Sequence, residues 1–194
     1  RLLAVSKTRD AGEIAALHAL GQADFGENYV QEALPKIEAL AGRGIRWHLI
    51  GPLQSNKTRE VAEHFDWVHS LDREKIARRL NDQRPPHLPP LQVCIQVNID
   101  DEDSKSGVAP GEVEALARVV TGLPRLALRG LMTIPRPDQP AGHASAYARL
   151  AQTMQHLAGT IPGLERTAFD TLSMGMSDDF EAAITHGATW VRIG

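Results

Sequence analysis

Short apolar runs alternate with amphipathic stretches along the chain. Eight of the runs are typical of buried strands, and they occupy residues 2–6, 22–25, 46–50, 66–70, 91–98, 127–132, 169–173 and 189–193. The stretches between them carry apolar residues three or four positions apart, which is the spacing of an amphipathic helix. Strand and helix patterns that alternate in this way predict an α/β fold with a parallel sheet.

The first helical stretch has the clearest boundary. Asp10, followed three residues later by Glu13, matches a capping box, in which each side chain accepts a hydrogen bond from the other residue's backbone. Ile14, Leu17 and Leu20 predict an apolar stripe that faces the sheet.

The later helices carry weaker signals. The second is predicted over residues 28–40, where Pro35 is expected to kink or split it, because proline lacks a backbone N–H and clashes with the preceding turn. Three further helices are predicted to begin at the N-cap residues Ser55, Asp72 and Ser177.

The strand count decides between two architectures. Eight strands with seven intervening helices predict a (β/α)8 barrel of the TIM type, and a doubly wound open sheet is the alternative. The chain has 194 residues, fewer than the roughly 250 of a typical barrel of this kind, so we expect short loops and a barrel slightly truncated at both ends. The proline-rich segment 85–90 is interpreted as a stiff surface loop, so residues 1–194 are predicted to form a single domain.

Composition narrows the class of protein. The net charge of −3 and the 23% of charged residues give no indication of a nucleic-acid or membrane surface. No apolar run approaches the roughly 20 residues of a membrane span, and the first residues lack a signal-peptide pattern. Cys94 is the single cysteine, which excludes an internal disulfide and predicts a reducing, cytoplasmic location.

Lys7 directly follows the first apolar run. A lysine at the carboxyl end of a barrel strand points toward the face where ligands bind. Burial there would lower its pKa, so that the neutral amine could attack a carbonyl carbon. The alternative is an ordinary charged residue at a strand end. Lys36 and Lys75, which fall in helical stretches, are expected to be solvated.

The segment 173–179 joins the seventh strand to a helix. Barrel enzymes often bind phosphate with the loops after strands seven and eight, where free backbone N–H groups favour an anion. Ser177 would offer a hydroxyl group there, and Gly194 would allow close approach of the backbone. The alternative for Ser177 is a plain N-cap. Asp178 and Asp179 oppose a phosphate unless their side chains turn away from it.

Three other side chains leave two interpretations open. Asn28 is either a helix N-cap or a hydrogen-bonding partner of a ligand. His48 lies in an apolar run and is more often a satisfied structural residue than a base. Arg192 is buried by its context and needs a partner, either a carboxylate or a ligand. The acidic run 100–103 lacks the spacing of a calcium loop, so we expect a solvated loop and no metal site.

Several blocks of the sequence together closely resemble the pyridoxal phosphate homeostasis family. The blocks are residues 4–8, 25–28, 47–57, 97–98, 104–107, 130–134, 172–179 and 191–194. The resemblance spans nearly the whole chain in order. It implies a barrel like the N-terminal domain of alanine racemase, with pyridoxal 5′-phosphate (PLP) as its cofactor.

The resemblance also implies a role for each of five residues. Lys7 would hold PLP as a Schiff base, and Asn28 would lie beside the ring. Ser177 and the backbone around Gly194 would hold the phosphate group, and Arg192 would face the pyridine nitrogen. An arginine cannot accept a proton from that nitrogen, which weakens the cofactor as an electron sink. No catalytic residue is therefore predicted.

The expected function is that of a non-catalytic carrier and buffer of PLP, which supplies the cofactor to apo-enzymes. The alternative is a PLP-dependent amino-acid racemase, which needs a second base, and Tyr29 and Tyr147 are the only tyrosines available. A barrel hydrolase or aldolase that uses Lys7 on a sugar phosphate is a third possibility. We expect a monomer that binds neither nucleic acid nor membrane.

Overall fold

The computed structural model describes residues 1–100, 106–136, 142–164 and 167–194. Its strands are β1 (Leu2–Val5), β2 (Asp24–Glu27), β3 (Arg46–Leu49), β4 (Trp67–Leu71), β5 (Leu91–Gln96), β6 (Leu126–Met132), β7 (Thr171–Ser173) and β8 (Val191–Ile193). Its α-helices are α1 (Ala11–Ala19), α2 (Val30–Ala39), α3 (Thr58–His64), α4 (Glu74–Gln83), α5 (Val113–Thr121), α6 (His143–Thr160) and α7 (Phe180–Thr185). Each predicted strand is present, with its ends within two residues of the prediction. The acidic run 100–103 lies outside the described residues except for Asp100.

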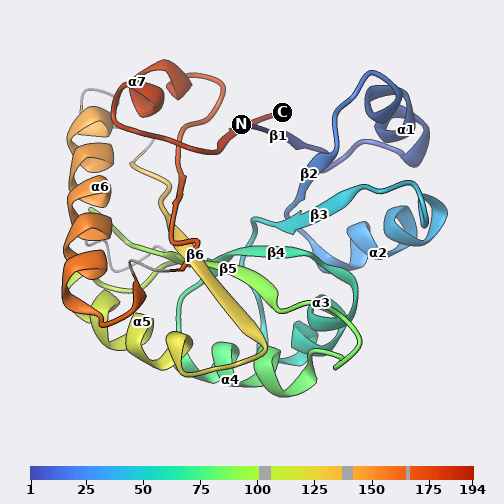
Figure 1. The fold of residues 1–194 in the computed structure, drawn as a ribbon. Helices are drawn as coiled ribbons and strands as arrows, with labels where there is room; N and C mark the ends of the chain where they lie inside the picture. The colour runs from blue at the N-terminus through green and yellow to red at the C-terminus, as the bar shows by residue number, and fades with distance from the viewer. Residues whose placement is uncertain (101–105, 137–141, 165–166) are drawn as a thin grey trace.

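The strands form a ring. All of their pairings are parallel, and β1 pairs with β2 on one side and with β8 on the other. An isolated bridge between Ser173 and Trp190 joins the end of β7 to the segment before β8. Figure 1 shows the strands on the inside and the helices around them. The predicted (β/α)8 barrel is confirmed, and the open-sheet alternative is wrong.

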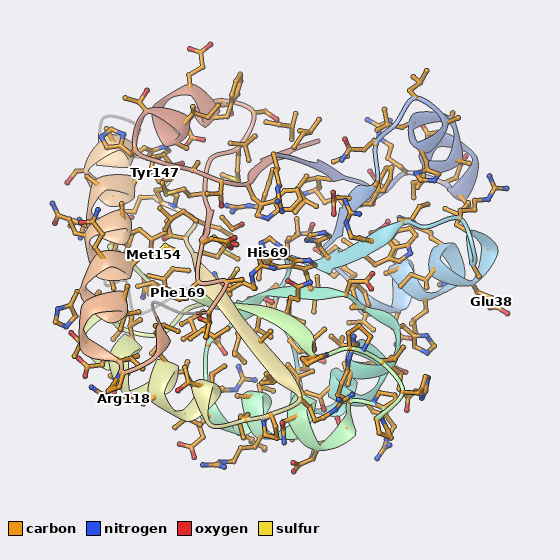
Figure 2. The ribbon with its side chains drawn as sticks, viewed as in Figure 1. Glu38, His69, Arg118, Tyr147, Met154 and Phe169 are labelled. Carbon is orange, nitrogen blue, oxygen red and sulfur yellow. The ribbon has the colours of Figure 1, made fainter. Side chains whose placement is uncertain are left out.

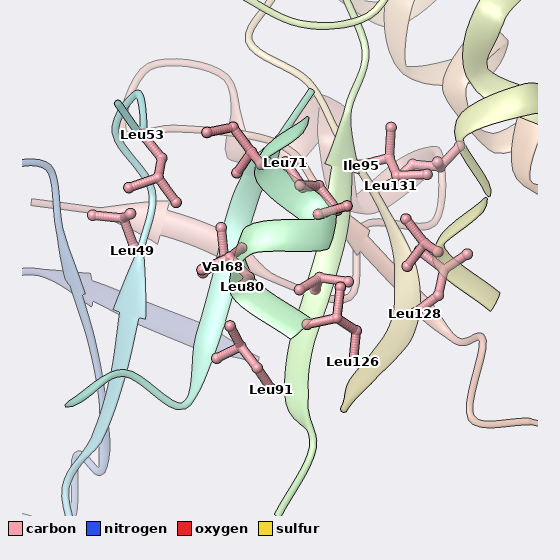
Figure 3. Close-up of a cluster of buried hydrophobic side chains, with 14 of the residues drawn as sticks. Leu49, Leu53, Val68, Leu71, Leu80, Leu91, Ile95, Leu126, Leu128 and Leu131 are labelled. Atoms are coloured by element: carbon pink, nitrogen blue, oxygen red, sulfur yellow. The ribbon is translucent and has the colours of Figure 1, made fainter. Parts of the chain in front are cut away.

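The main apolar core lies between the strands and the helices. Leu49, Val68 and Leu131 of the sheet are fully buried there, together with Leu80 of α4 (Figure 3). Shortening a buried leucine of this kind to alanine costs about 2–5 kcal/mol of stability. This outer layer stabilises the barrel and leaves room for polar side chains in the interior.

The barrel interior is smaller and more polar. Two small apolar clusters occupy part of it: Leu3 with Ile50 and Trp190, and Trp67 with Cys94 and Met132. The other buried side chains there include His48, His69, Ser173 and Arg192. Buried polar groups need hydrogen-bond partners, so each of these four side chains is expected to have at least one.

Helix α1 begins as predicted, but fewer of its apolar side chains are buried than expected. Asp10 and Glu13 form the capping box, with the Glu13 N–H donating to Asp10 Oδ1 over 2.8 Å. Ile14 is 2% exposed, but Leu17 is 41% and Leu20 86% exposed. The predicted stripe is wrong for these two leucines, because the helix ends at Ala19 and Leu17 lines an open groove beside β1.

Helix α2 begins two residues later than predicted, with Tyr29 as its N-cap. It continues through Pro35 without a break, so of the predicted kink or split the split does not occur. Pro35 and Gln31 are both exposed, and the carbonyl that loses its helical partner to the proline is that of Gln31. Water can hydrogen-bond to that carbonyl, which explains why the helix tolerates the proline.

The three predicted N-caps are wrong. Helices α3, α4 and α7 instead have the N-caps Lys57, Arg73 and Asp179, none with a side-chain capping bond. A 3-10 turn over Ser55–Lys57 precedes α3, and a further turn over 177–179 precedes α7. These turns move the helix starts beyond Ser55 and Ser177, whereas Asp72 misses the cap by one residue. In the described part of the chain, no helix combines the length and the apolar character that a membrane crossing requires.

Candidate functional site

One cavity brings together the five residues that the sequence predicts for a ligand site. Its volume is about 200 Å³, and it is lined by Val5, Lys7, Asn28, Ile50, Ile134, Met176, Ser177, Arg192 and Gly194. Each of these residues lies in the last residues of a strand or within four residues after its end, so the cavity lies at the carboxyl ends of the strands, where barrel enzymes bind their ligands. It is smaller than the roughly 300–1,000 Å³ of drug-sized sites, which suits a ligand with a single ring.

Lys7 lies at the rim of the cavity and is exposed, so the condition of burial, under which its pKa would fall, is not met. Strand β1 ends at Val5, and the chain then turns toward solvent. Thr8 adopts a φ of 65°, a left-handed conformation that costs roughly 1–3 kcal/mol outside glycine. Its N–H donates to Glu32 Oε1 on α2, which helps to hold the strained turn. The turn is fixed while the lysine amine stays accessible.

A buried ion-pair network supports the turn that carries Lys7. Lys36, expected to be solvated, is only 8% exposed. Its Nζ donates to Glu27 Oε1 (2.7 Å), to Glu32 Oε1 (3.1 Å) and to the carbonyl oxygen of Ser6 (2.9 Å). Burial raises the pKa of Glu27, and the contact with Lys36 opposes that shift. The prediction that Lys36 is solvated is wrong, because two carboxylates compensate for the burial of its charge.

Asn28 follows β2 and faces the cavity. The N-cap alternative is wrong for this residue, since Tyr29 holds that position. Its Oδ1 is buried and has no hydrogen-bond partner within the described structure. Gly51 approaches it so closely that a Cβ there would overlap the carbonyl oxygen of Asn28. An unpaired buried amide oxygen costs about 1–3 kcal/mol, which a ligand with a suitable donor would recover.

Arg192 forms the buried floor of the cavity and is 4% exposed. Its Nη1 donates to Ser173 Oγ over 2.8 Å, and its Nη2 donates to the carbonyl oxygen of Thr133 over 2.9 Å. Among the described residues, no carboxylate lies within ion-pair distance of the guanidinium. Burial lowers the pKa of Arg192 to about 10. Its hydrogen-bond partners are therefore neutral, and Asp179 acts on its charge only from beyond ion-pair distance.

The loop after β7 places Ser177 at the cavity and turns Asp179 away. Asp179 Oδ1 accepts from the Met176 N–H (2.7 Å), and Oδ2 accepts from the Tyr147 hydroxyl (2.6 Å) and from His143 Nδ1 (2.6 Å). Burial opposes ionisation of Asp179, but these hydrogen bonds outweigh it and lower its pKa. The carboxylate is thus held toward α6. Ser177 caps no helix and lines the cavity.

Gly194 borders the cavity beside β1. A Cβ at this position would lie 2.6 Å from Val5 Cβ, so only glycine allows the two strands to approach so closely. Asp178 is exposed and does not line the cavity. Neither aspartate therefore blocks an anion at this place. The described residues hold no group of three histidine, cysteine or acidic side chains that is suited to a metal ion.

Relatives called pyridoxal phosphate homeostasis protein match the chain over its full length. The one from Pseudomonas aeruginosa is 58% identical over 195 residues, which cover 100% of this chain and 81% of the relative. The one from Escherichia coli K12 is 56% identical over 198 residues, covering 100% and 82%. The chain belongs to the pyridoxal phosphate homeostasis family. The model of the alanine racemase N-terminal domain also matches residues 1–194.

Solved structures share this barrel. PipY from Synechococcus elongatus PCC7942 without PLP is 37% identical and superposes with a TM-score of 0.92, covering 100% of this chain and 90% of PipY. The PLP-bound form of PipY is 36% identical with a TM-score of 0.90 and the same coverage. Alanine racemase from Corynebacterium glutamicum is 14% identical, with a TM-score of 0.70 and coverage of 100% and 54%. That likeness shows the fold alone.

Sequence reasoning missed His69 and the burial of Lys36, two polar groups that do not line the cavity but support residues that do. His48 is hydrogen-bonded through both ring nitrogens, to Asp24 and to His69, and His69 in turn contacts Ser173. The structural interpretation of His48 therefore fits better than that of a base. The sequence carried one signal of this pair: the apolar runs of two successive strands each contain a histidine, His48 and His69. For Lys36, the signal was its spacing of four residues from a glutamate on the same helix.

Proposed function

We propose that this chain holds PLP covalently at Lys7 and serves as a carrier and buffer of that cofactor, without strong catalytic activity. The observation that supports this most is the convergence of Lys7, Asn28, Ser177, Arg192 and Gly194 on one cavity. The PLP-bound structure of the family member PipY supports the choice of ligand. Each of the five residues has chemistry that suits one part of the molecule.

Lys7 is proposed to anchor the cofactor. Bound PLP supplies a reactive aldehyde and an electron-withdrawing ring. The Lys7 amine forms a carbon–nitrogen bond with the aldehyde carbon, and water leaves. Because Lys7 is exposed at the rim, the same bond remains open to hydrolysis or to exchange with another amine. Reversible capture of this kind is what a carrier requires.

Arg192 and Asn28 are proposed to hold the ring. Arg192 donates an N–H to the pyridine nitrogen and cannot accept a proton from it, so the nitrogen stays an acceptor. A ring held in this state withdraws electrons weakly and disfavours carbanion chemistry. Asn28 offers its unpaired Oδ1 at the side of the ring. The site is thus suited to holding the cofactor rather than to transforming amino acids.

The phosphate group is proposed to lie against Ser177 and Gly194. Ser177 donates its hydroxyl, and the backbone at Gly194 approaches closely because that residue has no Cβ. Asp179 accepts three hydrogen bonds, two of them from α6, and these hold its carboxylate away from this position. An anion beside the loop after strand seven matches a common arrangement in barrel proteins.

Neither of the two tyrosines is placed to act as the second base that the racemase alternative needs. Tyr29 is 63% exposed and does not line the cavity. Tyr147 is fully buried, and both its burial and its hydrogen bond to Asp179 raise its pKa. A phenol in that state is a poor proton acceptor at neutral pH. The proposal of a non-catalytic protein rests on this observation.

The cellular part of the proposal follows from the chemistry of the site. A protein that captures PLP reversibly can protect its aldehyde and supply it to PLP-dependent apo-enzymes. A reducing, cytoplasmic location and a monomeric state belong to the same proposal. The location rests on the single free cysteine, Cys94, which is buried.

Absorbance titration with PLP tests the proposal. The wild-type protein is expected to develop a visible band that saturates at one PLP per chain, and Lys7→Ala is expected to develop none. Lys75→Ala is the matched control, because Lys75 is exposed on α4 and does not line the cavity. It should behave like the wild type.

Two further assays separate a carrier from an enzyme. The loaded protein should restore activity to a PLP-dependent apo-enzyme, and it should leave D- and L-alanine unconverted. A visible band of full strength in Lys7→Ala would contradict the assigned anchor. Measurable racemisation by the loaded wild type that is absent from Lys7→Ala would favour the alternative function.

A further inference from the structure

A continuous chain of hydrogen bonds crosses the barrel interior beneath the cavity. It runs from Asp24 on β2 through His48 on β3, His69 on β4 and Ser173 on β7 to Arg192 on β8. The four successive links measure 3.0, 2.9, 2.7 and 2.8 Å. No member is more than 7% exposed. Figure 2 shows His69 near the centre of the molecule, among the strands.

The two ends of this chain fix the direction of every hydrogen bond in it. A guanidinium only donates, and an ionised carboxylate only accepts. His48 Nε2 therefore carries the proton that faces Asp24, and Nδ1 of the neutral ring accepts from His69 Nε2. His69 Nδ1 then accepts from the Ser173 hydroxyl, whose oxygen accepts from Arg192 Nη1.

The opposite direction requires a charged histidine. If His69 Nδ1 donated to Ser173, its Nε2 would accept from His48 Nδ1, and His48 would then carry protons on both nitrogens. Burial opposes such a charge and lowers the pKa of both histidines. Burial also opposes ionisation of Asp24, but hydrogen bonds from His48 and Arg46 outweigh it and lower its pKa to about 2. The acceptor end is therefore ionised at neutral pH.

Aromatic packing fixes the planes of the two imidazole rings. The His48 ring stacks on Trp67, with 5.4 Å between centroids and 11° between planes, and Trp190 packs edge-on at 5.2 Å. The His69 ring lies 5.7 Å from Trp67. Neither histidine can turn without disturbing this cluster, so the chain is organised before any ligand arrives.

We propose that His69 is a positioning residue that acts through Ser173 to orient Arg192 toward the cavity. The Ser173 hydroxyl has its proton committed to His69, so its oxygen is held as an acceptor for Nη1. The carbonyl of Thr133 holds Nη2, and the guanidinium plane is fixed at both ends. The remaining N–H groups of Arg192 then serve the ligand. This inference rests on the proposed function in taking that ligand to be PLP.

The direction of the hydrogen bonds between Asp24 and Arg192 can be tested on the protein without PLP. Long-range proton–nitrogen NMR spectra of protein labelled with ¹⁵N-histidine report which ring nitrogen carries the proton. At pH 7, His48 and His69 are both expected to be neutral and protonated at Nε2. A proton on Nδ1 of either ring would overturn the inference, whatever the protein binds.

PLP titration of serine variants tests the positioning role. Ser173→Ala is expected to weaken PLP binding about tenfold, equivalent to about 1.4 kcal/mol, and to shift the visible absorbance maximum. Ser173→Thr retains the hydroxyl and should recover much of the affinity. Ser70→Ala is the matched control, because Ser70 is a buried serine of β4 whose hydroxyl has no partner in the described structure. It should keep the wild-type affinity and spectrum.

The outcomes separate this inference from the proposed function. Wild-type affinity and an unchanged spectrum in Ser173→Ala would overturn the positioning role while leaving PLP binding intact. Failure of the wild type to bind PLP would overturn the proposed function, and the histidine spectra would still decide the direction of the chain. If Ser173→Ala does not fold, Asp24→Asn provides the test, because an amide both donates and accepts. Asp24→Asn should populate the Nδ1-protonated form of His48 and weaken PLP binding, and wild-type affinity together with an unchanged histidine spectrum would overturn the positioning role.

Discussion

Two buried cations support opposite sides of the cavity, and their partners differ. Lys36 lies under the rim between the carboxylates of Glu27 and Glu32. Arg192 lies at the floor and is bonded to a hydroxyl group and a carbonyl oxygen, both neutral. A buried charge that its own protein neutralises is structural, whereas one without a counterion is available to a ligand. The partners, rather than the burial, distinguish the functional cation.

The largest loss of stability is expected from removing Lys36, the cation that two carboxylates neutralise. Lys36→Met leaves the Glu27 carboxylate buried without a cation, since the Glu27 side chain is fully buried. Removing one partner of such a pair lowers the free energy of unfolding by about 3–5 kcal/mol. Urea unfolding measures this change. Adding Glu27→Gln to Lys36→Met should recover part of the loss, and no recovery would contradict the ion pair.

Acid titration tests Asp24, which lies at the opposite end of the hydrogen-bond chain from Arg192. The pKa of Asp24 is about 2 in the folded protein against 3.8 as the reference, so its stabilisation is complete above pH 3.8 and is lost as the pH falls toward 2. This difference corresponds to about 2 kcal/mol. Asp24→Asn should lose that amount at neutral pH and flatten the unfolding curve between pH 4 and 2. An unchanged curve would show that Asp24 is not stabilised as an anion.

Removing the cation at the floor of the cavity, Arg192, is expected to change stability much less than removing Lys36. Burial lowers the pKa of Arg192 from 12.5 to about 10, which corresponds to about 3 kcal/mol of unfavourable burial of its charge. Arg192→Met removes that cost but leaves two buried neutral acceptors unpaired, at about 1–3 kcal/mol each, so the two effects largely offset each other. The free energy of unfolding of the PLP-free variant should therefore change by less than about 2 kcal/mol in thermal unfolding, while the variant binds PLP weakly. Strong destabilisation would mean that Arg192 is structural, as Lys36 is.

The smallest change in stability is expected at Lys7. Its side chain is exposed at the rim, so Lys7→Ala should alter the free energy of unfolding by less than about 0.5 kcal/mol. The same substitution should abolish covalent attachment of PLP. Circular dichroism and urea unfolding, compared with Lys75→Ala, measure the first effect. A loss of several kcal/mol would show that the amine also supports the turn.

Much of the fold follows from the sequence because the strands alternate with helices and each strand is a short apolar run. The eight strands and the capping box at Asp10 are examples of signals that are local in the chain. The helix starts near Ser55 and Ser177 were mispredicted because additional turns precede the helices. A side chain suited to capping does not show whether the backbone beside it is helical.

The site residues were predictable only in part. Lys7 and Asn28 directly follow strands, a position that marks the ligand face of a barrel. Neither the burial of Lys36 nor the exposure of Lys7 could be predicted, because both depend on how α2 packs against the turn after β1. The bond between His69 and Ser173 joins residues 104 positions apart, so no local pattern reveals it.

The central claim is that Lys7 is the anchor for PLP at the cavity. Borohydride reduction of the protein mixed with PLP, followed by peptide mass spectrometry, tests it most directly. We expect one modified peptide, which carries the reduced adduct on Lys7, and no adduct on the exposed Lys75 or the buried Lys36. Adducts spread over several lysines, or no adduct at all, would contradict it.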